Sequence, residues 1–314
     1  MFPENKKRSQ ELIKILKKEG FLRQEIGVAV IDFKKASPEI FGYNINNFFY
    51  PASVFKIFVG AEILDRIENG EFSLDQKIKI ISFPDQKNKI FPTLSKVDLQ
   101  ERKEASLDEL LLLMLAKSDN LATNLLVELI GFGTLGKEII QKYKWSGSGL
   151  TDFFRNRIKE NRKFRYTETT KLSPRHTAEF FYLVEKEGLV SVFVSKKLKE
   201  YMSEWTSSPI LNYSPYYKKG GYMENNLYIP GHGFHYKKTG FALDYAIVGF
   251  LRLVKTIVTE GWAFRCWVND SGVVKGEKSN YVLSIFTFNK QISPFKKFKI
   301  EKLEKVIYDF MEGN

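Results

Sequence analysis

The spacing of apolar and polar positions predicts a helix and then a pair of strands at the start of the chain. Apolar residues recur at helical intervals over residues 6–20, and a glycine ends the pattern. The segments 25–33 and 40–49 are rich in β-branched and apolar residues and flank a Ser-Pro turn. We therefore expect an N-terminal helix followed by two antiparallel strands.

The middle of the chain has the pattern of buried helices. Residues 53–69 are apolar on most faces and are followed by Gly70, a typical helix end. Residues 106–130 open with a Ser-x-x-Glu capping box and contain two leucine-rich stretches separated by a polar break at 117–120. Another helix is predicted to begin at Ser173, with proline in its first turn.

Strand-like runs return in the last third of the chain. Residues 213–236 are rich in Gly, Tyr and Lys and indicate a loop. The segments 246–251, 263–268 and 281–288 have strand character, and an amphipathic helix over 300–311 ends the pattern.

This order of elements predicts an α+β fold. The simplest way to bury the strands is one antiparallel sheet built from both chain ends, with the helical middle as a second lobe. We expect one catalytic domain over 1–314, with a sheet lobe from 1–50 and 221–314 and a helical lobe from 51–220. A functional site is expected in a cleft between the lobes.

Composition narrows the class of protein. The 314 residues are 43% hydrophobic and 27% charged, which is typical of a globular protein and argues against disorder. The single cysteine, Cys266, excludes an intramolecular disulfide and disfavours a cysteine-based zinc site. The histidines His176, His232 and His235 form no HExxH pattern, so we expect no metal and no cofactor. No apolar run is long enough to span a membrane, and no signal peptide is visible.

The chain is basic. Forty-nine Lys and Arg face 37 Asp and Glu, a formal net charge of +12. Such a balance favours anionic partners such as nucleic acid, lipid headgroups or cell-wall polymers. The alternative is a lysine-rich surface without a partner, because the charge is scattered as Lys-Lys pairs and forms no five-residue block.

The first motif with candidate chemistry is Ser53-x-x-Lys56. Positions three apart share a helix face, so the Lys56 amine can reach the Ser53 hydroxyl. A buried lysine loses its proton readily and can then accept the serine proton. The alternative is that Ser53 only caps the helix. The same pattern at Ser293 and Lys296, near the C-terminus, shows how weak the motif is in isolation.

Two further motifs follow. Ser118-Asp119-Asn120 interrupts the helical pair, where it either caps the next helix or supplies a hydroxyl proton relay and an amide that binds substrate. In Lys238-Thr239-Gly240, at the expected start of a strand, a cation and a hydroxyl can hold a substrate carboxylate. The glycine there lets the backbone approach a ligand.

In this order and spacing, the three motifs resemble those of the penicillin-recognising serine hydrolases, most closely the class A β-lactamases. The segments 49–80, 106–131 and 266–289 are similar to the nucleophile helix, the second motif region and the last two strands of that family. The resemblance covers about three-quarters of the chain and implies the α+β β-lactamase/transpeptidase-like fold.

The resemblance implies acyl transfer to Ser53. It implies that Lys56 acts as general base or proton relay and that Ser118 donates a proton to the leaving nitrogen. It also implies that Lys238 and Thr239 bind the carboxylate of the substrate. It also implies that Asn120 and Gly240 line the substrate site. The implied oxyanion hole consists of the backbone N–H groups of Ser53 and Phe241.

One family feature is missing from the sequence. Class A enzymes carry Glu-x-x-Leu-Asn between the second and third motifs, and its glutamate activates the deacylating water. Here Glu160 is followed by Asn-Arg-Lys. Glu160 and Glu168 are the candidate water bases; otherwise both are solvated loop carboxylates.

The leading hypothesis is a serine β-lactamase-like hydrolase that acts on β-lactams or related amides, an activity associated with antibiotic resistance. The alternatives are a DD-peptidase-like penicillin-binding enzyme that deacylates slowly and a non-catalytic relative that binds the cell wall. We expect a small β-lactam or D-alanyl peptide as substrate and consider peptidoglycan a further partner. We expect no nucleic acid partner, a monomer, and a location outside the cytoplasm by family resemblance.

Overall fold

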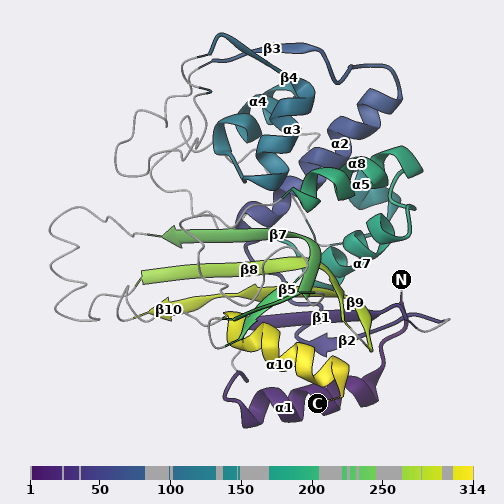
Figure 1. The fold of residues 1–314 in the computed structure, drawn as a ribbon, viewed down its shortest axis with the longest axis vertical. Helices are drawn as coiled ribbons and strands as arrows, with labels where there is room; N and C mark the ends of the chain where they lie inside the picture. The colour runs from purple at the N-terminus through teal and green to yellow at the C-terminus, as the bar shows by residue number, and fades with distance from the viewer. Residues whose placement is uncertain are drawn as a thin grey trace, which may run out of the picture.

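The computed structural model shows helices on both faces of one antiparallel sheet (Figure 1). It describes residues 2–22, 25–34, 37–81, 99, 102–131, 137–146, 148, 170–204, 221–224, 227–230, 233–244, 264–276, 278–291 and 300–313.

The sheet joins the two ends of the chain. Its six strands are β1 (Ile26–Asp32), β2 (Glu39–Tyr43), β7 (Gly233–Asp244), β8 (Phe264–Lys275), β9 (Asn280–Thr287) and β10 (Asn289–Gln291). The strands pair in the order β7-β8-β9-β1-β2, all antiparallel, and β10 pairs with the first residues of β8. The predicted α+β fold, with a sheet from both chain ends, is therefore confirmed. The boundaries of a single domain stay a prediction.

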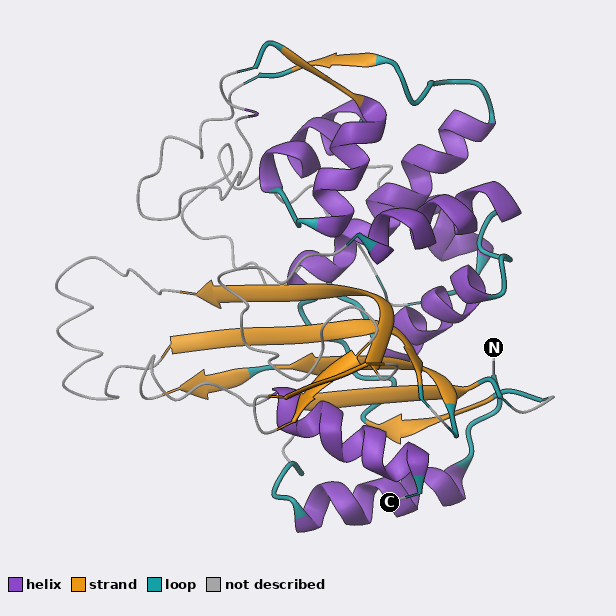
Figure 2. Ribbon diagram, viewed as in Figure 1, coloured by secondary structure: helices purple, strands orange, loops and turns teal. Residues whose placement is uncertain are grey.

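The helical lobe covers one face of the sheet (Figure 2). Its elements are η1 (Ala52–Phe55), α2 (Lys56–Glu68), β3 (Lys77–Lys79), β4 (Glu104–Ser106), α3 (Leu107–Ala116), α4 (Asn120–Ile130), α5 (Lys137–Lys142), α7 (Pro174–Glu185) and α8 (Val192–Ser203). Helix α7 packs against β1, β8 and β9 and connects this lobe to the sheet. In the part of the chain that the structure describes, no helix is both long and apolar enough to cross a membrane.

Helices α1 (Lys6–Lys18) and α10 (Ile300–Glu312) cover the opposite face (Figure 1). Strand β1 is buried along its whole length because it is covered on both faces. Ala29 and Ile31 point into the core under the helical lobe, whereas Val28 and Val30 point into the core under α1 and α10. Because side chains alternate along a strand, one short segment contributes to both hydrophobic cores.

The predicted helix starts at the serine caps are confirmed. The Ser106 hydroxyl accepts a hydrogen bond from the Glu109 amide, and the Ser173 hydroxyl accepts one from the His176 amide. The polar break at 117–120 separates α3 from α4. The predicted continuous helix from Ser53 is instead a 3₁₀ turn, η1, that leads into α2.

The prediction of a loop over 213–236 is wrong for its described part. Strands β5 (Gly221–Glu224) and β6 (Leu227–Pro230) pair with each other, and β7 begins at Gly233. Glycine suggested turns here, but tyrosine is a good strand former, and pairing with β8 outweighs the local composition. The Lys-Thr-Gly motif lies within β7, not at the start of a strand.

The other strand predictions differ in outcome. The 281–288 segment corresponds to β9, and the 263–268 segment to the first half of a longer β8. The predicted strand at 246–251 lies outside the described residues.

Candidate active site

Ser53 lies in the tight turn that precedes α2. It is the second residue of η1, its side chain is part-buried, and the cap positions of η1 and α2 are held by Pro51 and Phe55. The interpretation of Ser53 as a helix cap is therefore wrong. Ala52, the preceding residue, has φ +47°. A non-glycine residue costs about 1–3 kcal/mol in that region and persists only where surrounding contacts hold it.

Lys56 is fully buried at the first position of α2. Its ammonium donates hydrogen bonds to Ser118 O at 2.8 Å, to Ser118 Oγ at 3.2 Å and to Asn120 Oδ1 at 2.7 Å. Lys56 therefore connects the nucleophile motif to the Ser-Asp-Asn motif, 62 to 64 residues further along the chain.

Burial changes the acid–base chemistry of this amine. Desolvation lowers the pKa of Lys56 to about 7, and the nearby charge of Asp119 acts in the opposite direction. A lysine with this pKa is partly neutral near physiological pH, which an exposed lysine is not.

The predicted contact between Lys56 and Ser53 is not formed in this structure. All three hydrogen bonds recorded for Lys56 go to Ser118 and Asn120, and none among the described residues goes to the Ser53 hydroxyl. A 3₁₀ turn keeps residues three apart on the same side, so spacing does not prevent the contact; the Lys56 amine is instead directed to Ser118 and Asn120.

The Ser118-Asp119-Asn120 segment caps α4 and also contacts the buried amine of Lys56. Asp119 Oδ1 accepts a hydrogen bond from the Ala122 amide at 2.8 Å, so Asp119 is the cap of α4. Ser118 has φ +58°, which turns its carbonyl and hydroxyl toward Lys56. The capping interpretation is confirmed for Asp119, while its two neighbours contact the buried amine.

Lys238 reaches the same region from the sheet. Its side chain is 3% exposed, and its ammonium donates to Met114 O at 2.8 Å and Leu115 O at 2.9 Å, near the C-terminal end of α3. Burial lowers the pKa of Lys238 well below its usual value, and the charge of Lys56 lowers it further. The site therefore has two buried lysines, and protonation of one disfavours protonation of the other.

The backbone of the third motif passes next to the nucleophile turn. Lys238, Thr239, Gly240 and Phe241 are consecutive in β7, opposite Ser271 to Val268 of β8, and β7 packs against η1. The tertiary structure thus brings the three motifs together. Glu160 and Glu168 lie outside the described residues.

A family model described as "Beta-lactamase enzyme family" matches residues 7–226, more than half of the chain. The chain belongs to the β-lactamase enzyme family. A comparison with curated proteins gave no match.

Solved structures of this family share the fold. A class A β-lactamase from Bacteroides cellulosilyticus is 21% identical, with a TM-score of 0.66 and 97% of each chain covered. The TLA-3 extended-spectrum β-lactamase is 18% identical, with a TM-score of 0.70, 96% of this chain and 98% of that chain covered. PBP-A is 17% identical, with a TM-score of 0.66 and full coverage of both chains. At these identities, the similarity shows the fold.

Asn269 is a buried residue next to the motifs that the sequence analysis missed. It lies in β8 opposite Gly240 and has no exposed surface. Its Nδ2 donates to Tyr50 O at 3.0 Å, and its Oδ1 accepts from the Thr287 amide at 3.0 Å. Asn269 therefore anchors the start of the nucleophile turn to the sheet. The only available signal was an asparagine within a strand-forming run, where asparagine is disfavoured.

Asn124 is a second such residue. It lies one turn after Asn120 on α4 and is 3% exposed, yet neither polar atom of its side chain has a hydrogen-bond partner among the described residues. Buried amides are ordinarily hydrogen-bonded, so Asn124 is one of several exceptions among the buried polar side chains that the structure describes.

In the described ranges, no group of three or more His, Cys, Asp or Glu side chains could hold a metal ion. His232 and the side chain of His235 lie outside what the structure describes.

Proposed function

We propose that the protein is a serine acyl hydrolase in which Ser53 attacks the carbonyl carbon of a β-lactam or a related amide. The observation that carries the proposal is the fully buried Lys56, which directly follows the turn that contains Ser53. Burial lowers the pKa of Lys56 to about 7, and its amine contacts Ser118 and Asn120. A lysine buried without function would be an unfavourable element of a core.

The proposed proton path runs from Ser53 to Lys56, a contact that is expected to form with substrate bound, and then along the existing contact between Lys56 and Ser118. Neutral Lys56 needs only two of its three present hydrogen bonds, so its lone pair can accept the Ser53 proton as the oxygen attacks. The resulting ammonium is adjacent to the Ser118 hydroxyl, at 3.2 Å, which can pass a proton to the leaving nitrogen. The C–N bond then breaks, and the acyl group remains on Ser53.

The remaining motif residues are proposed to bind substrate. Lys238 and Thr239 hold the carboxylate, and the charge of that carboxylate favours the ammonium form of Lys238. Asn120 and Gly240 line the substrate. The backbone N–H groups of Ser53 and Phe241 form the oxyanion hole, which is consistent with the packing of β7 on η1.

A second candidate function is acylation with slow deacylation, as in a DD-peptidase-like penicillin-binding enzyme. The departure from Glu-x-x-Leu-Asn at Glu160 favours it. So does the similarity to PBP-A, one mutant of which was solved as an acyl-enzyme complex with penicillin G. If the enzyme deacylates, Glu160 or Glu168 is the proposed water base. Family membership supports small β-lactam or D-alanyl substrates and a location outside the cytoplasm.

The experiment is intact-protein mass spectrometry over time after penicillin is added, with Ser53→Ala as the matched control. An adduct that appears and clears while the drug is consumed supports the hydrolase. An adduct that persists on wild type and is absent from Ser53→Ala supports the slow-deacylating enzyme. If wild type forms no adduct and consumes no drug, β-lactam chemistry is overturned, and the non-catalytic alternative becomes the better hypothesis.

A further inference from the structure

Helix α1 presents an unusual concentration of lysine on one side. Its exposed residues are Lys6, Lys7, Gln10, Glu11, Lys14, Lys17 and Lys18. At about 100° per residue, these positions fall within an arc of about 140° around a helix about 18 Å long. One side of helix α1 therefore carries five positive charges and one negative charge.

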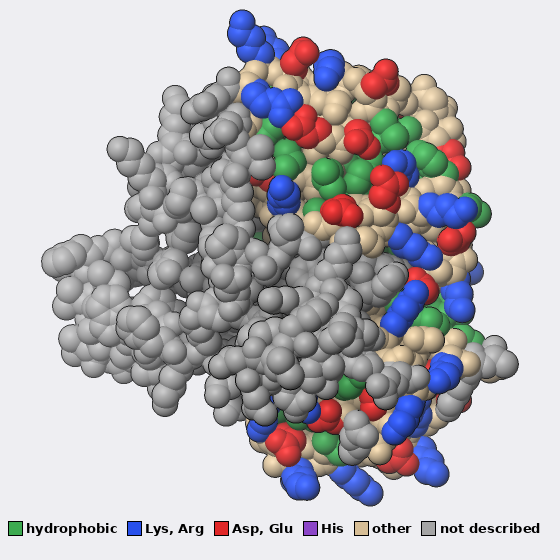
Figure 3. Space-filling model, viewed as in Figure 1, with side chains coloured by type: hydrophobic (Ala, Val, Ile, Leu, Met, Phe, Trp, Pro, Cys, Tyr) green, Lys and Arg blue, Asp and Glu red, His purple; other side chains and the backbone are tan. Residues whose placement is uncertain are grey.

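Among the described residues, no lysine of α1 forms an ion pair with a carboxylate, although the charge of Lys18 acts on the neighbouring Glu19. The neighbouring helix α10 is different, because Lys302 pairs with Glu19 and Lys305 with Asp309. In the space-filling view, Lys and Arg side chains project from the lower edge of the molecule, where α1 lies (Figure 3).

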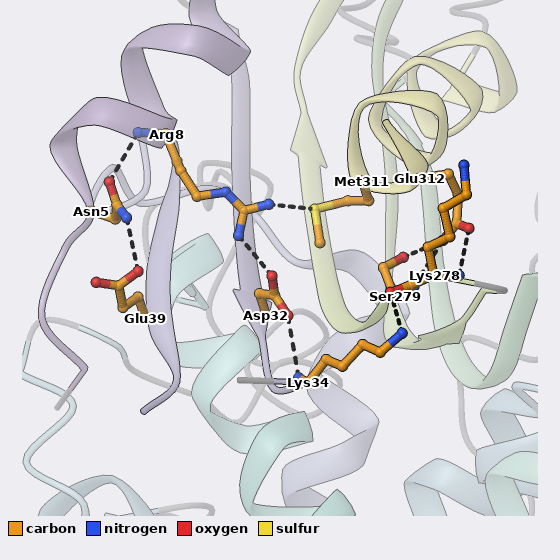
Figure 4. A network of polar contacts seen from close by, with 9 residues as sticks. All are labelled: Asn5, Arg8, Asp32, Lys34, Glu39, Lys278, Ser279, Met311 and Glu312. Carbon is orange, nitrogen blue, oxygen red and sulfur yellow. Dashed lines mark hydrogen bonds and ion pairs between the residues drawn. The ribbon is translucent and has the colours of Figure 1, made fainter. Parts of the chain in front are cut away.

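The helix is held rigidly on the sheet. Leu12 and Leu16 are fully buried in the core that α1 shares with α10. The Arg8 guanidinium donates to Asp32 Oδ2 at 2.8 Å and to Met311 Sδ at 3.4 Å (Figure 4). Because these lysines belong to a helix that is packed on the sheet, a ligand can bind them with little loss of backbone conformational entropy.

We propose that this lysine face of α1 docks the protein on an anionic phospholipid bilayer. The exposed arc contains no aromatic or aliphatic side chain, so contact would be with headgroup phosphates and not with acyl chains. A convex face without aromatic residues matches a flat array of phosphates better than single-stranded nucleic acid, which binds in grooves with stacking platforms.

The position of the face leaves the candidate active site accessible. Helix α1 lies on one side of the sheet, whereas η1 and α2 lie with the helical lobe on the other (Figure 1). A protein docked through α1 therefore keeps the lobe that carries Ser53 away from the bilayer. The proposal does not depend on the chemistry of Ser53.

The test is co-sedimentation of the full chain with vesicles that contain phosphatidylglycerol and with pure phosphatidylcholine vesicles. A triple variant, K7E/K14E/K18E, is compared with K77E/K79E/K103E, which removes the same net charge from exposed positions of the helical lobe. Each lysine near an anionic surface is expected to strengthen binding about fivefold, so the α1 variant should bind at least about a hundredfold more weakly. The control should stay within about threefold of wild type.

Vesicle binding is also measured as a function of salt concentration and in the presence of a DNA duplex as competitor. Binding should be strong at about 0.01 M salt and lost at about 1 M, where the Debye length falls to roughly 3 Å. Equal weakening of both variants would show an effect of net charge alone and overturn the proposal. It would also be overturned by failure of wild type to bind phosphatidylglycerol vesicles, or by a DNA duplex that displaces them at equal phosphate concentration.

Discussion

At the scale of single residues, the site is defined by polar groups in environments that disfavour them. Lys56 is a fully buried amine. Ala52, just before Ser53, and Ser118, which accepts hydrogen bonds from Lys56, are non-glycine residues with positive φ. Each of these features costs free energy. Their concentration around one serine supports the proposed catalytic role of that serine.

The pH dependence of acylation tests the role of Lys56. Only the neutral amine can accept the Ser53 proton, and burial lowers the pKa of Lys56 to about 7. The acylation rate constant should therefore rise as pH increases through about 7 and level off above it. The measurement is stopped-flow acylation by a chromogenic β-lactam between pH 5 and 9.

Lys56→Arg is the matched variant, because it keeps the positive charge but does not deprotonate in this range. It should acylate about 10²–10⁴ times more slowly. A wild-type rate that is flat from pH 5 to 9 would contradict the assignment of Lys56 as the base.

At the scale of elements, the nucleophile turn is held by two strands of the sheet as well as by the helix that it precedes. Strand β8 carries Asn269, whose amide bonds to Tyr50 O just before η1. Strand β7 packs against the same turn and delivers Lys238 to the carbonyl groups of α3. The position of Ser53 therefore depends on residues more than 200 positions away.

Asn269→Ala should affect stability and acylation together. It leaves Tyr50 O and the Thr287 amide without this buried partner, which should lower the free energy of unfolding by about 1–3 kcal/mol. It should also slow acylation at saturating drug more than it raises the KM, because the turn loses its anchor. Urea denaturation and stopped-flow acylation measure the two effects.

Ser284→Ala is the control. It removes a buried hydrogen bond to Ser271 within the same sheet but leaves the bond from Asn269 to Tyr50 O in place. We expect it to lower stability and leave the acylation rate unchanged. If both variants reduce acylation in proportion to stability, Asn269 is only structural.

At the scale of the whole molecule, hydrogen bonds and an ion pair connect the first and last helices to the sheet. Near the C-terminus, the Glu312 carboxylate accepts hydrogen bonds from the Lys278 and Ser279 amides and from the Ser279 hydroxyl in the turn between β8 and β9 (Figure 4). At the N-terminus, Arg8 pairs with Asp32 of β1. The two contacts involve α1 and α10, the helices that cover the sheet face opposite the helical lobe (Figure 1).

Glu312→Ala should therefore weaken the fold without changing the chemistry of Ser53. The loss of three acceptor contacts from a carboxylate that is 5% exposed should lower the free energy of unfolding by about 2–3 kcal/mol. Lys305→Ala, which removes an exposed ion pair from the same helix, should cost less than about 1 kcal/mol. Equal urea midpoints for Glu312→Ala and wild type would contradict this account.

Local patterns were sufficient for much of this description. Helical spacing, serine caps and the polar break at 117–120 depend on residues within a few positions of one another, and the helices formed where these signals occur. The three motifs could also be identified in order, because each consists of three or four neighbouring residues. Family and fold class follow from these features together.

What only the tertiary structure decided depends on contacts between distant segments. The sequence predicted that Lys56 contacts Ser53, but the tertiary fold directs its amine to Ser118 and Asn120. The 233–244 segment became a strand by pairing with β8, and Asn269 gained its role from Tyr50 and Thr287. The periodicity of hydrophobic positions indicates the local secondary structure and which face of an element is buried. It does not indicate which buried polar groups contact each other, because those contacts form only when the helical lobe packs against the sheet.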